Sequence, residues 1–181
     1  MASLLVVVTG APAVGKSRLA ERLAAELRLP LLAKDDVKLA LYETFGAPDQ
    51  DASHLLGEAA FEVLFTVVRR LLEAGAGAVL EGNFVRGRSE ARMAPLTKLA
   101  SAVQVWCGAA REETLRRYSE RRRHPMHFDE ANLARIVAAL DSGRHDPLDL
   151  AVPSIRVDTT DGYRPSVEEI LAFVRRAGGR S

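Results

Sequence analysis

An eight-residue pattern near the start of the chain constrains its fold more than any other feature. Residues 10–17 read GAPAVGKS and match G-x-x-x-x-G-K-[ST] at every fixed position. The pattern follows an apolar run at 4–9 and opens a segment with apolar residues at helical spacing, 16–28. A glycine-rich loop between a buried strand and a helix is typical of phosphate-binding loops. The sequence therefore predicts a site for a nucleoside triphosphate, and we expect ATP with Mg²⁺.

The chemistry of this loop explains its residue types. Its glycines let the backbone approach closely, so that successive N–H groups point at phosphate oxygens. We expect Lys16 to reach the β- and γ-phosphates and Ser17 to give Mg²⁺ a hydroxyl ligand. The predicted nucleotide-binding residues of this segment are Gly10, Ala11, Pro12, Ala13, Val14, Gly15, Lys16, Ser17 and Arg18.

The remaining chain alternates short apolar runs with longer helical patterns. Strands are expected at 4–9, 31–33, 78–80, 102–107 and 154–158. Helices are expected at 16–28, 36–45, 53–74, 88–100, 111–123, 129–140 and 165–176, the last with Pro165 in its first turn. This alternation predicts a single α/β domain over residues 1–181, a three-layer α/β/α sandwich with a five-stranded parallel sheet. Ligands of such sheets bind at the carboxyl ends of the strands.

The net charge and the cysteine content restrict the classes of binding partner and the cellular compartment that we expect. The net charge is +1, from 25 basic and 24 acidic residues, so no overall field attracts long nucleic acids or anionic membranes. The single cysteine, Cys107, excludes an internal disulfide and fits a reducing cytosol. The apolar run at 4–8 is too short for a membrane span and has no basic flank. We expect a cytoplasmic protein without a signal peptide, as a monomer or a homodimer.

Two aspartates follow the second expected strand, in the segment AKDDVK at 33–38. A carboxylate beside the phosphate loop can take the proton of a hydroxyl whose oxygen attacks the γ-phosphorus. We assign Asp35 as this base and Asp36 as a metal contact, with Asp36 as the alternative base. Helix capping and interaction with the helix dipole are the competing explanation for the pair.

The same segment resembles the second strand end of small P-loop kinases, where an Asp activates the acceptor hydroxyl and a basic residue follows. Polynucleotide 5′-kinases, chloramphenicol phosphotransferases, adenylylsulfate kinases and zeta-toxin kinases are similar here. The resemblance implies that Lys38 contacts the acceptor or a phosphate. It covers nearly the whole chain, through four segments in the expected order, and implies a nucleotide-kinase-like fold with a helical lid.

The segment VLEGNF at 79–84 ends the third expected strand. In the similar kinases this strand end contributes to metal and acceptor handling, which implies a metal role for Glu81 and acceptor binding by Asn83. Arg86, and with it Arg88, is a candidate contact for an anionic acceptor. The alternative is a plain turn, of which Gly and Asn are typical. No long hydrophobic strand ends in a plain Walker B aspartate, so the second contact of the metal must come from Asp35, Asp36 or Glu81, and their roles are partly interchangeable.

A basic helix is expected at 111–123, and it carries six arginines. Arg117 and Arg121 are four residues apart and share a face. The segment 117–121 resembles the lid of the same kinases, here predicted at 116–128. The resemblance implies that these arginines close over the transferring phosphate and neutralise its charge. A solvated basic face is the alternative.

Two histidines, His124 and His127, follow this helix. We favour a lid tip or acceptor-contacting loop over a metal site, because no Cys or Glu ligand set accompanies them.

The last strand ends in VDTTDG at 157–162, which resembles the D-T-[ST] segment of these kinases. The resemblance implies that Thr159 and Thr160 lie beside the adenine; a polar turn is the alternative. Together these segments predict an ATP-dependent phosphotransferase acting on a hydroxyl of a small molecule or nucleotide. Nucleic acid enters only as a short 5′-end substrate. The alternative is an ATP-binding or ATP-hydrolysing switch protein, in which Asp35 would orient water.

Overall fold

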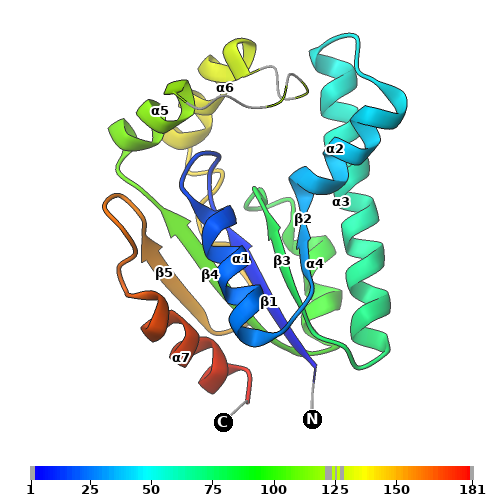
Figure 1. Ribbon diagram of the computed structural model, residues 1–181, viewed down its shortest axis with the longest axis vertical. Helices are drawn as coiled ribbons and strands as arrows, with labels where there is room; N and C mark the ends of the chain where they lie inside the picture. The colour runs from blue at the N-terminus through cyan, green and yellow to red at the C-terminus, as the bar shows by residue number, and fades with distance from the viewer. Residues whose placement is uncertain (1–2, 121–123, 125, 127–128, 180–181) are drawn as a thin grey trace.

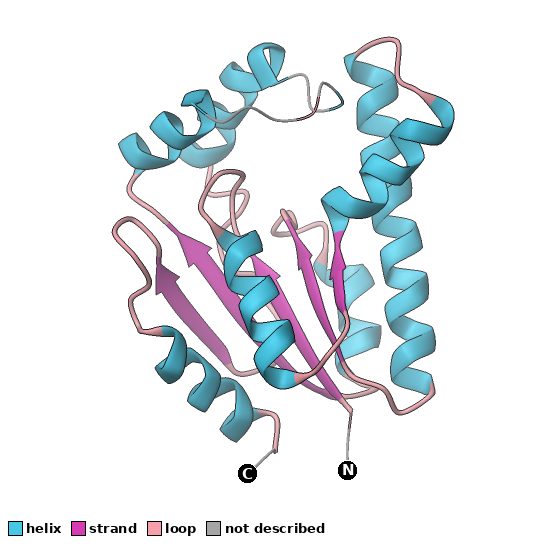
Figure 2. Ribbon diagram, viewed as in Figure 1, coloured by secondary structure: helices cyan, strands magenta, loops and turns pink. Residues whose placement is uncertain are grey.

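The computed structural model describes residues 3–120, 124, 126 and 129–179 of the chain, without the side chains of 129–132. In this part of the chain, parallel strands form one five-stranded sheet in the order β2-β3-β1-β4-β5 (Figure 2). The strands are β1 (Leu4–Thr9), β2 (Leu31–Ala33), β3 (Ala78–Gly82), β4 (Ser101–Gly108) and β5 (Ser154–Asp158). The predicted five-stranded parallel sheet is therefore confirmed.

Helices cover both faces of the sheet, as Figure 1 shows, which gives the predicted three layers. They are α1 (Lys16–Leu27), α2 (Lys34–Phe45), α3 (Gln50–Glu73), α4 (Glu90–Thr97), α5 (Arg111–Glu120), α6 (Asp129–Asp141) and α7 (Val167–Ala177). The central strand explains the layering, since its side chains alternate between two cores. Leu4, Val6 and Val8 pack with α1 and α7, whereas Leu5 and Val7 pack with α3 and α4. A strand buried on both faces has to be apolar throughout, which is why β1 was recognisable.

Two helical units rise above the carboxyl ends of the strands (Figure 1). The α2–α3 hairpin stands on the β2 side, and α5 with α6 stands over β1 and β4. Both chain termini lie at the opposite end of the molecule. The carboxyl edge of the sheet is therefore enclosed by helices from two sides.

Several element boundaries differ from those expected, among them the start of α3, which begins at Gln50 and not at residue 53. Helix α2 begins at Lys34, directly after β2, so Asp35 and Asp36 lie in its first turn. Helix α4 is shorter than expected and covers only Glu90–Thr97. Helix α7 begins at Val167 because Ser166 and Glu169 form a capping box, with each side chain accepting a hydrogen bond from the other's backbone. Pro165 precedes this cap, so its placement in the first turn was wrong.

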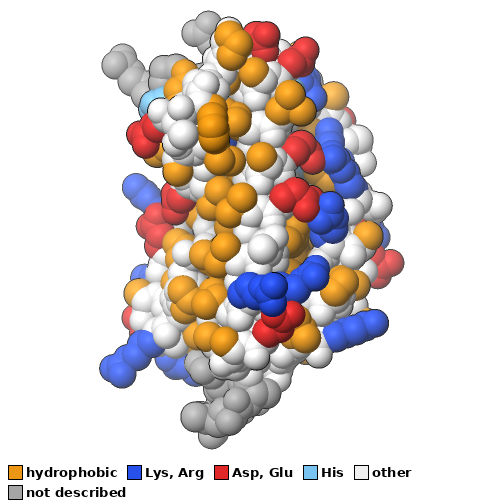
Figure 3. Space-filling view, turned by 90° about the vertical axis from the view of Figure 1, so that its right-hand side faces the viewer, with side chains coloured by type: hydrophobic (Ala, Val, Ile, Leu, Met, Phe, Trp, Pro, Cys, Tyr) orange, Lys and Arg blue, Asp and Glu red, His pale blue; other side chains and the backbone are white. Residues whose placement is uncertain are grey.

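The outer side of α3 is a mixed surface, seen in Figure 3, where apolar side chains alternate with acidic and basic ones. Leu55 and Val63 are exposed on this helix. Two ion pairs join α3 to the segment after β3: Arg88 to Glu58 at 2.6 Å and Arg92 to Glu62 at 2.5 Å. These pairs join α3 to the loop after β3 and to α4. None of the described helices combines the length and apolar character needed to cross a membrane.

Candidate functional site

The loop between β1 and α1 has the backbone geometry that its glycines make possible. Gly10 has φ +147°, and a Cβ there would lie 2.2 Å from the carbonyl oxygen of Cys107 on β4. Gly15 has φ +81° and is the N-cap of α1. Helix α1 begins at Lys16, inside the phosphate loop of residues 10–17. The backbone N–H groups at the start of the helix, which have no partner within it, therefore lie at the loop. Positively polarised N–H groups at a helix N-terminus bind phosphate, so the loop has the structure expected of a phosphate site.

Lys16 is held inside this site. Its Nζ lies 3.5 Å from Oε1 of Glu81 and donates to the carbonyl oxygen of Ala11 at 3.4 Å. Both charged side chains are buried, Lys16 with 9% and Glu81 with 4% of its surface exposed. Burial raises the pKa of Glu81, and the charges of Asp35 and Asp36 add to this, whereas Lys16 opposes it. The Glu81 carboxylate is therefore in a position where further positive charge would stabilise it.

The predicted metal contacts fit Mg²⁺ only in a partly hydrated form. No group of three or more His, Cys, Asp or Glu side chains with metal-binding geometry occurs among the residues that the structure describes. Mg²⁺ in nucleotide sites keeps several waters and takes phosphate oxygens, with one or two protein ligands. Ser17 follows Lys16 at the helix start, and Glu81 is buried beside it, so these residues suit that kind of coordination.

Asp35 lies in the first turn of α2, with its Oδ1 3.1 Å from Nζ of Lys34. The N-cap of α2 is Ala33, which has no side-chain cap hydrogen bond. Neither Asp35 nor Asp36 therefore occupies the cap position, although both lie where the helix dipole favours negative charge.

Two cavities open at the carboxyl edge of the sheet. The first, called here the loop cavity, has a volume of about 740 Å³ and is lined by Ser17, Arg18 and Arg117 among others. The second, called here the inner cavity, has a volume of about 300 Å³ and lies between the α2–α3 hairpin and the residues 135–145. The residues that line both cavities are Lys16 and Asp35. The predicted phosphate-binding lysine and the predicted base thus stand where the two cavities meet.

Arg117 is the described lid arginine that faces the loop cavity. Its Nη2 donates to the carbonyl oxygens of Thr159 and Thr160, each at 2.8 Å, and its Nε donates to Glu113 at 2.5 Å. Arg116 instead pairs on the exposed side of α5 with Glu113 and Glu120. On α5, Arg117 thus faces the loop cavity, whereas Arg116 lies on the exposed side. Contact of Arg117 with a phosphate stays a prediction.

The end of β5 is bonded to the phosphate loop. The hydroxyl of Thr159 lies 2.5 Å from the carbonyl oxygen of Val14 and 3.0 Å from that of Gly108, so its single proton is donated to one of them or shared between both. Thr159 also lines the loop cavity. The hydroxyl of Thr160 accepts from the backbone N–H of Ala110 at 2.8 Å. Contact of either threonine with an adenine stays a prediction, and the hydroxyl of Thr159 is already engaged with the protein backbone.

The expected acceptor residues are distributed unequally over the inner cavity. Lys38 and Asn83 line it, as does Arg88, but Arg86 is not part of the lining. Lys38 is buried, and its Nζ donates to Oγ of Ser53 at 2.7 Å and to the carbonyl oxygen of Met126 at 3.1 Å. Its ammonium group therefore also binds the α2–α3 hairpin to the segment after α5.

Some lid predictions fall outside the part of the chain that the structure describes. These are Arg121, Arg122, Arg123 and His127, and the predicted lid 116–128 is described only at 116–120, 124 and 126. His124 packs edge-on against Tyr42 with ring centroids 5.1 Å apart.

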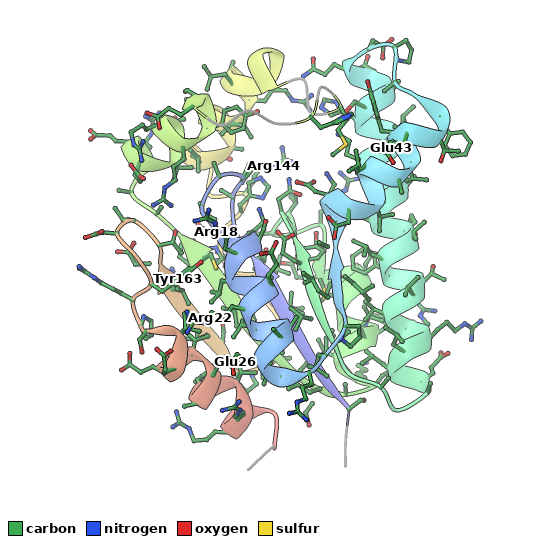
Figure 4. The ribbon with its side chains drawn as sticks, in the orientation of Figure 1. Arg18, Arg22, Glu26, Glu43, Arg144 and Tyr163 are labelled. Carbon is green, nitrogen blue, oxygen red and sulfur yellow. The ribbon has the colours of Figure 1, made fainter. Side chains whose placement is uncertain are left out.

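Several residues that line the inner cavity were not predicted from the sequence, among them Arg135, Arg144 and His145. Arg135 lies in α6, and the other two lie in the turn that follows it. Figure 4 shows Arg144 above the carboxyl ends of the strands, below α5 and α6. The segment SGRHD at 142–146 has no periodicity and no recognisable pattern, so no local signal marked it.

Comparisons with known proteins agree with this geometry. A family model described as an AAA domain matches residues 5–142. A shikimate kinase of Bradyrhizobium diazoefficiens is 32% identical over 125 residues, covering 67% of this chain and 56% of that protein. The chain thus spans little more than half the length of this curated relative.

Solved structures are similar over nearly the whole chain. A candidate kinase from Chloroflexus aurantiacus J-10-fl has a TM-score of 0.85 and 31% identity, over 98% of this chain and 99% of that one. A gluconokinase from Sinorhizobium meliloti 1021 has a TM-score of 0.60 and 18% identity, over 98% and 94% of the two chains. At that identity the second similarity concerns the fold alone.

Proposed function

Because this chain belongs to the AAA domain family and to the small P-loop kinases, we propose that it transfers the γ-phosphate of ATP to a hydroxyl group. The observation that carries the proposal is the position of Lys16 and Asp35, which line both cavities. ATP bound by the phosphate loop occupies the loop cavity, and the acceptor occupies the inner cavity. Phosphoryl transfer requires donor and acceptor oxygens to meet in line, which a shared wall between two cavities permits.

Asp35 acts as the base in this proposal. Its carboxylate borders the inner cavity, so a hydroxyl bound there can give up its proton as its oxygen attacks the γ-phosphorus. Lys34, 3.1 Å away, orients this carboxylate through their ion pair. Asp36, the next residue in the same turn, remains the alternative base.

Lys16 binds the transferring phosphate. In the structure its ammonium group lies between Glu81 and the Ala11 carbonyl, and both positions border the phosphate loop. Phosphate oxygens carry more charge than a carbonyl, so we expect ATP to draw Lys16 toward the β- and γ-phosphates. Ser17 and either Glu81 or Asp36 would hold Mg²⁺, which would screen the phosphate charge.

Arg117 stabilises charge on the phosphates. Its guanidinium group lines the loop cavity and is held by the β5 end, so it is oriented before ATP binds. A pre-oriented cation stabilises a transition state without reorganisation, which is where such groups contribute most. Arg121 is proposed for the same role on the basis of its spacing from Arg117.

The acceptor is a small molecule with an anionic group. A volume of about 300 Å³ suits a compact metabolite. Of the cavity's arginines, Arg88 pairs with Glu58 and Arg135 lies 3.0 Å from His54, whereas the guanidinium group of Arg144 has no hydrogen-bond or ion-pair partner among the described residues. An uncompensated guanidinium in a cavity wall favours a carboxylate or phosphate on the ligand.

The test is a panel of acceptors, called here the acceptor panel: shikimate, D-gluconate, D-glucose, chloramphenicol and an oligonucleotide with a 5′-hydroxyl. ADP release is measured with each compound and compared with the acceptor-free background. We expect release well above background with a small acid, together with a phosphorylated product. A flat response with steady ATP hydrolysis would instead favour the switch protein.

A further inference from the structure

A buried histidine, His145, forms part of the wall of the inner cavity. Only 8% of its surface is exposed. Its Nδ1 lies 3.0 Å from the carbonyl oxygen of Phe84. A carbonyl oxygen can only accept, so Nδ1 carries a proton and donates it in this hydrogen bond. The bond thereby selects one tautomer of the ring.

Residues from or next to β3 and β4, the two strands that flank β1, hold His145 in place. Phe84, which follows β3, is fully buried and receives the Nδ1 hydrogen bond. From β4, the indole Nε1 of Trp106 donates to the carbonyl oxygen of His145 at 2.7 Å. The backbone N–H of Arg86 donates to the carbonyl oxygen of Arg144 at 2.9 Å. His145 is therefore attached to the sheet, although it lies in a turn.

The other ring nitrogen, Nε2, is available to a ligand. It has no hydrogen-bond partner among the residues that the structure describes. Among the described residues, the fully buried side-chain nitrogen and oxygen atoms that lack a hydrogen-bond partner are Thr9 Oγ1 and Glu90 Oε2. Nε2 of His145 also lacks a partner but is not one of these atoms, so it is accessible. His145 lines the inner cavity, and its Nδ1 is engaged by Phe84, so Nε2 is the ring nitrogen left to face the cavity.

The surroundings of the His145 ring favour its neutral form. Burial lowers the pKa of His145, and the charges of Arg144 and Lys16 lower it further, against the opposing effect of the Phe84 hydrogen bond. A neutral imidazole with its proton on Nδ1 has a lone pair on Nε2 and can only accept there. The arginines and lysines of the cavity, by contrast, are donors.

We propose that Nε2 of His145 accepts a hydrogen bond from a second donor of the acceptor molecule, separate from the hydroxyl that is phosphorylated. This inference rests on the proposed function and specifies its substrate class: a small molecule with at least two hydroxyl groups, or a hydroxyl and an N–H group. Asp35 engages the reacting hydroxyl from α2, and His145 engages the second donor from the turn after α6. A buried acceptor left without a donor is costly, so this contact discriminates against ligands that lack the donor.

Two substitutions by amide residues distinguish the role of Nδ1 of His145 from that of Nε2. In His145→Asn the side-chain amide lies near the position of Nδ1 and can still donate to Phe84, but nothing replaces Nε2. In His145→Gln the longer side chain brings an amide oxygen near the position of Nε2. We expect His145→Asn to raise KM for the best compound of the acceptor panel about tenfold, with kcat at saturation within about twofold, and His145→Gln to restore part of the loss.

Monodeoxy forms of the same compound test whether His145 contacts the ligand. Discrimination between the parent compound and a deoxy form would not change if His145 had only a structural role. The wild-type protein should discriminate against one deoxy form about tenfold, and His145→Asn should accept that form and the parent compound equally. An unchanged KM in His145→Asn, a loss confined to kcat, or discrimination that survives the substitution would overturn the inference.

A measurement on the unsubstituted protein covers the case in which the variants do not fold. Nitrogen-15 NMR should show His145 with its proton on Nδ1, and the Nε2 resonance should shift when the same compound is added. A proton on Nε2, or an unmoved resonance at saturation, would contradict the inference. If wild-type protein phosphorylates no compound of the panel, the proposed function fails and takes the inference with it. If only the His145 results fail, the proposed function stands.

Discussion

The ammonium group of Lys16 lies 3.5 Å from the carboxylate of Glu81, and both groups are buried beside the phosphate loop. This pair joins the first residue of α1 to β3, the strand next to β1 in the sheet. The lysine that should bind phosphate is thus paired with a carboxylate that can later serve the metal. When ATP binds, Lys16 has to exchange its contact with Glu81 for contacts with the phosphates.

Glu81 should make stability depend on pH. A carboxyl group whose pKa is higher in the folded than in the unfolded protein contributes stability at low pH, and this contribution is lost as the pH rises through the folded pKa. Burial is the main cause of the raised pKa of Glu81. The melting temperature of Glu81→Gln relative to wild type should therefore increase between about pH 5 and about pH 8 in nucleotide-free protein. A constant difference across that range would contradict the burial effect.

Arg117 and Arg116 form a matched pair of neighbours with different surroundings. Arg117→Ala removes the cation that lines the loop cavity, so kcat should fall by about 10²-fold or more. Arg116→Ala removes an exposed ion pair and should leave kcat within about twofold. Steady-state kinetics with the best panel compound measures both. Equal effects of the two substitutions would indicate a general charge effect rather than a directed one.

Thr159 should matter for stability through its hydroxyl. Thr159→Val keeps the shape but leaves the carbonyl oxygens of Val14 and Gly108 without this donor. The free energy of unfolding should fall by about 1–3 kcal/mol, as measured by urea denaturation. Thr160→Val, whose hydroxyl is more exposed, is the control and should cost less than about 1 kcal/mol. A negligible effect of Thr159→Val would mean that the loop is held by other contacts.

Much of the fold was predictable because its signals are local. The buried strands read as apolar runs, and the phosphate loop is a contiguous pattern whose geometry depends on its own glycines. The boundaries were less predictable. Ala33 ends β2 and caps α2 at once, so Asp35 lies in a helix and not at a strand end. At α7 the capping box of Ser166 overrode the preference of Pro165 for a first turn.

The inner cavity was predictable only in part, because tertiary structure assembles it. Arg135, Arg144 and His145 come from a helix and a turn that carry no motif of their own. The role of His145 depends on Phe84 and Trp106, which are distant in the sequence. Arg86 was expected in the site, but it contributes a backbone N–H to the same turn instead.

We propose that Lys16 and Asp35 mark the boundary between a nucleotide site and an acceptor site. The substitution Lys16→Ala should weaken both ATP binding and transfer, because Lys16 serves the bound phosphates themselves. Asp35→Asn should leave ATP affinity nearly intact, since the phosphate loop does not depend on this carboxylate.

The most direct test is the rate of product formation by Asp35→Asn with the best compound of the acceptor panel, alongside the dissociation constant of ATP. We expect kcat to fall about 10²–10⁴-fold, which is the usual contribution of a general base, and the ATP dissociation constant to stay within about twofold of wild type. Full turnover by Asp35→Asn, with the same acceptor and the same ATP affinity, would contradict this proposal.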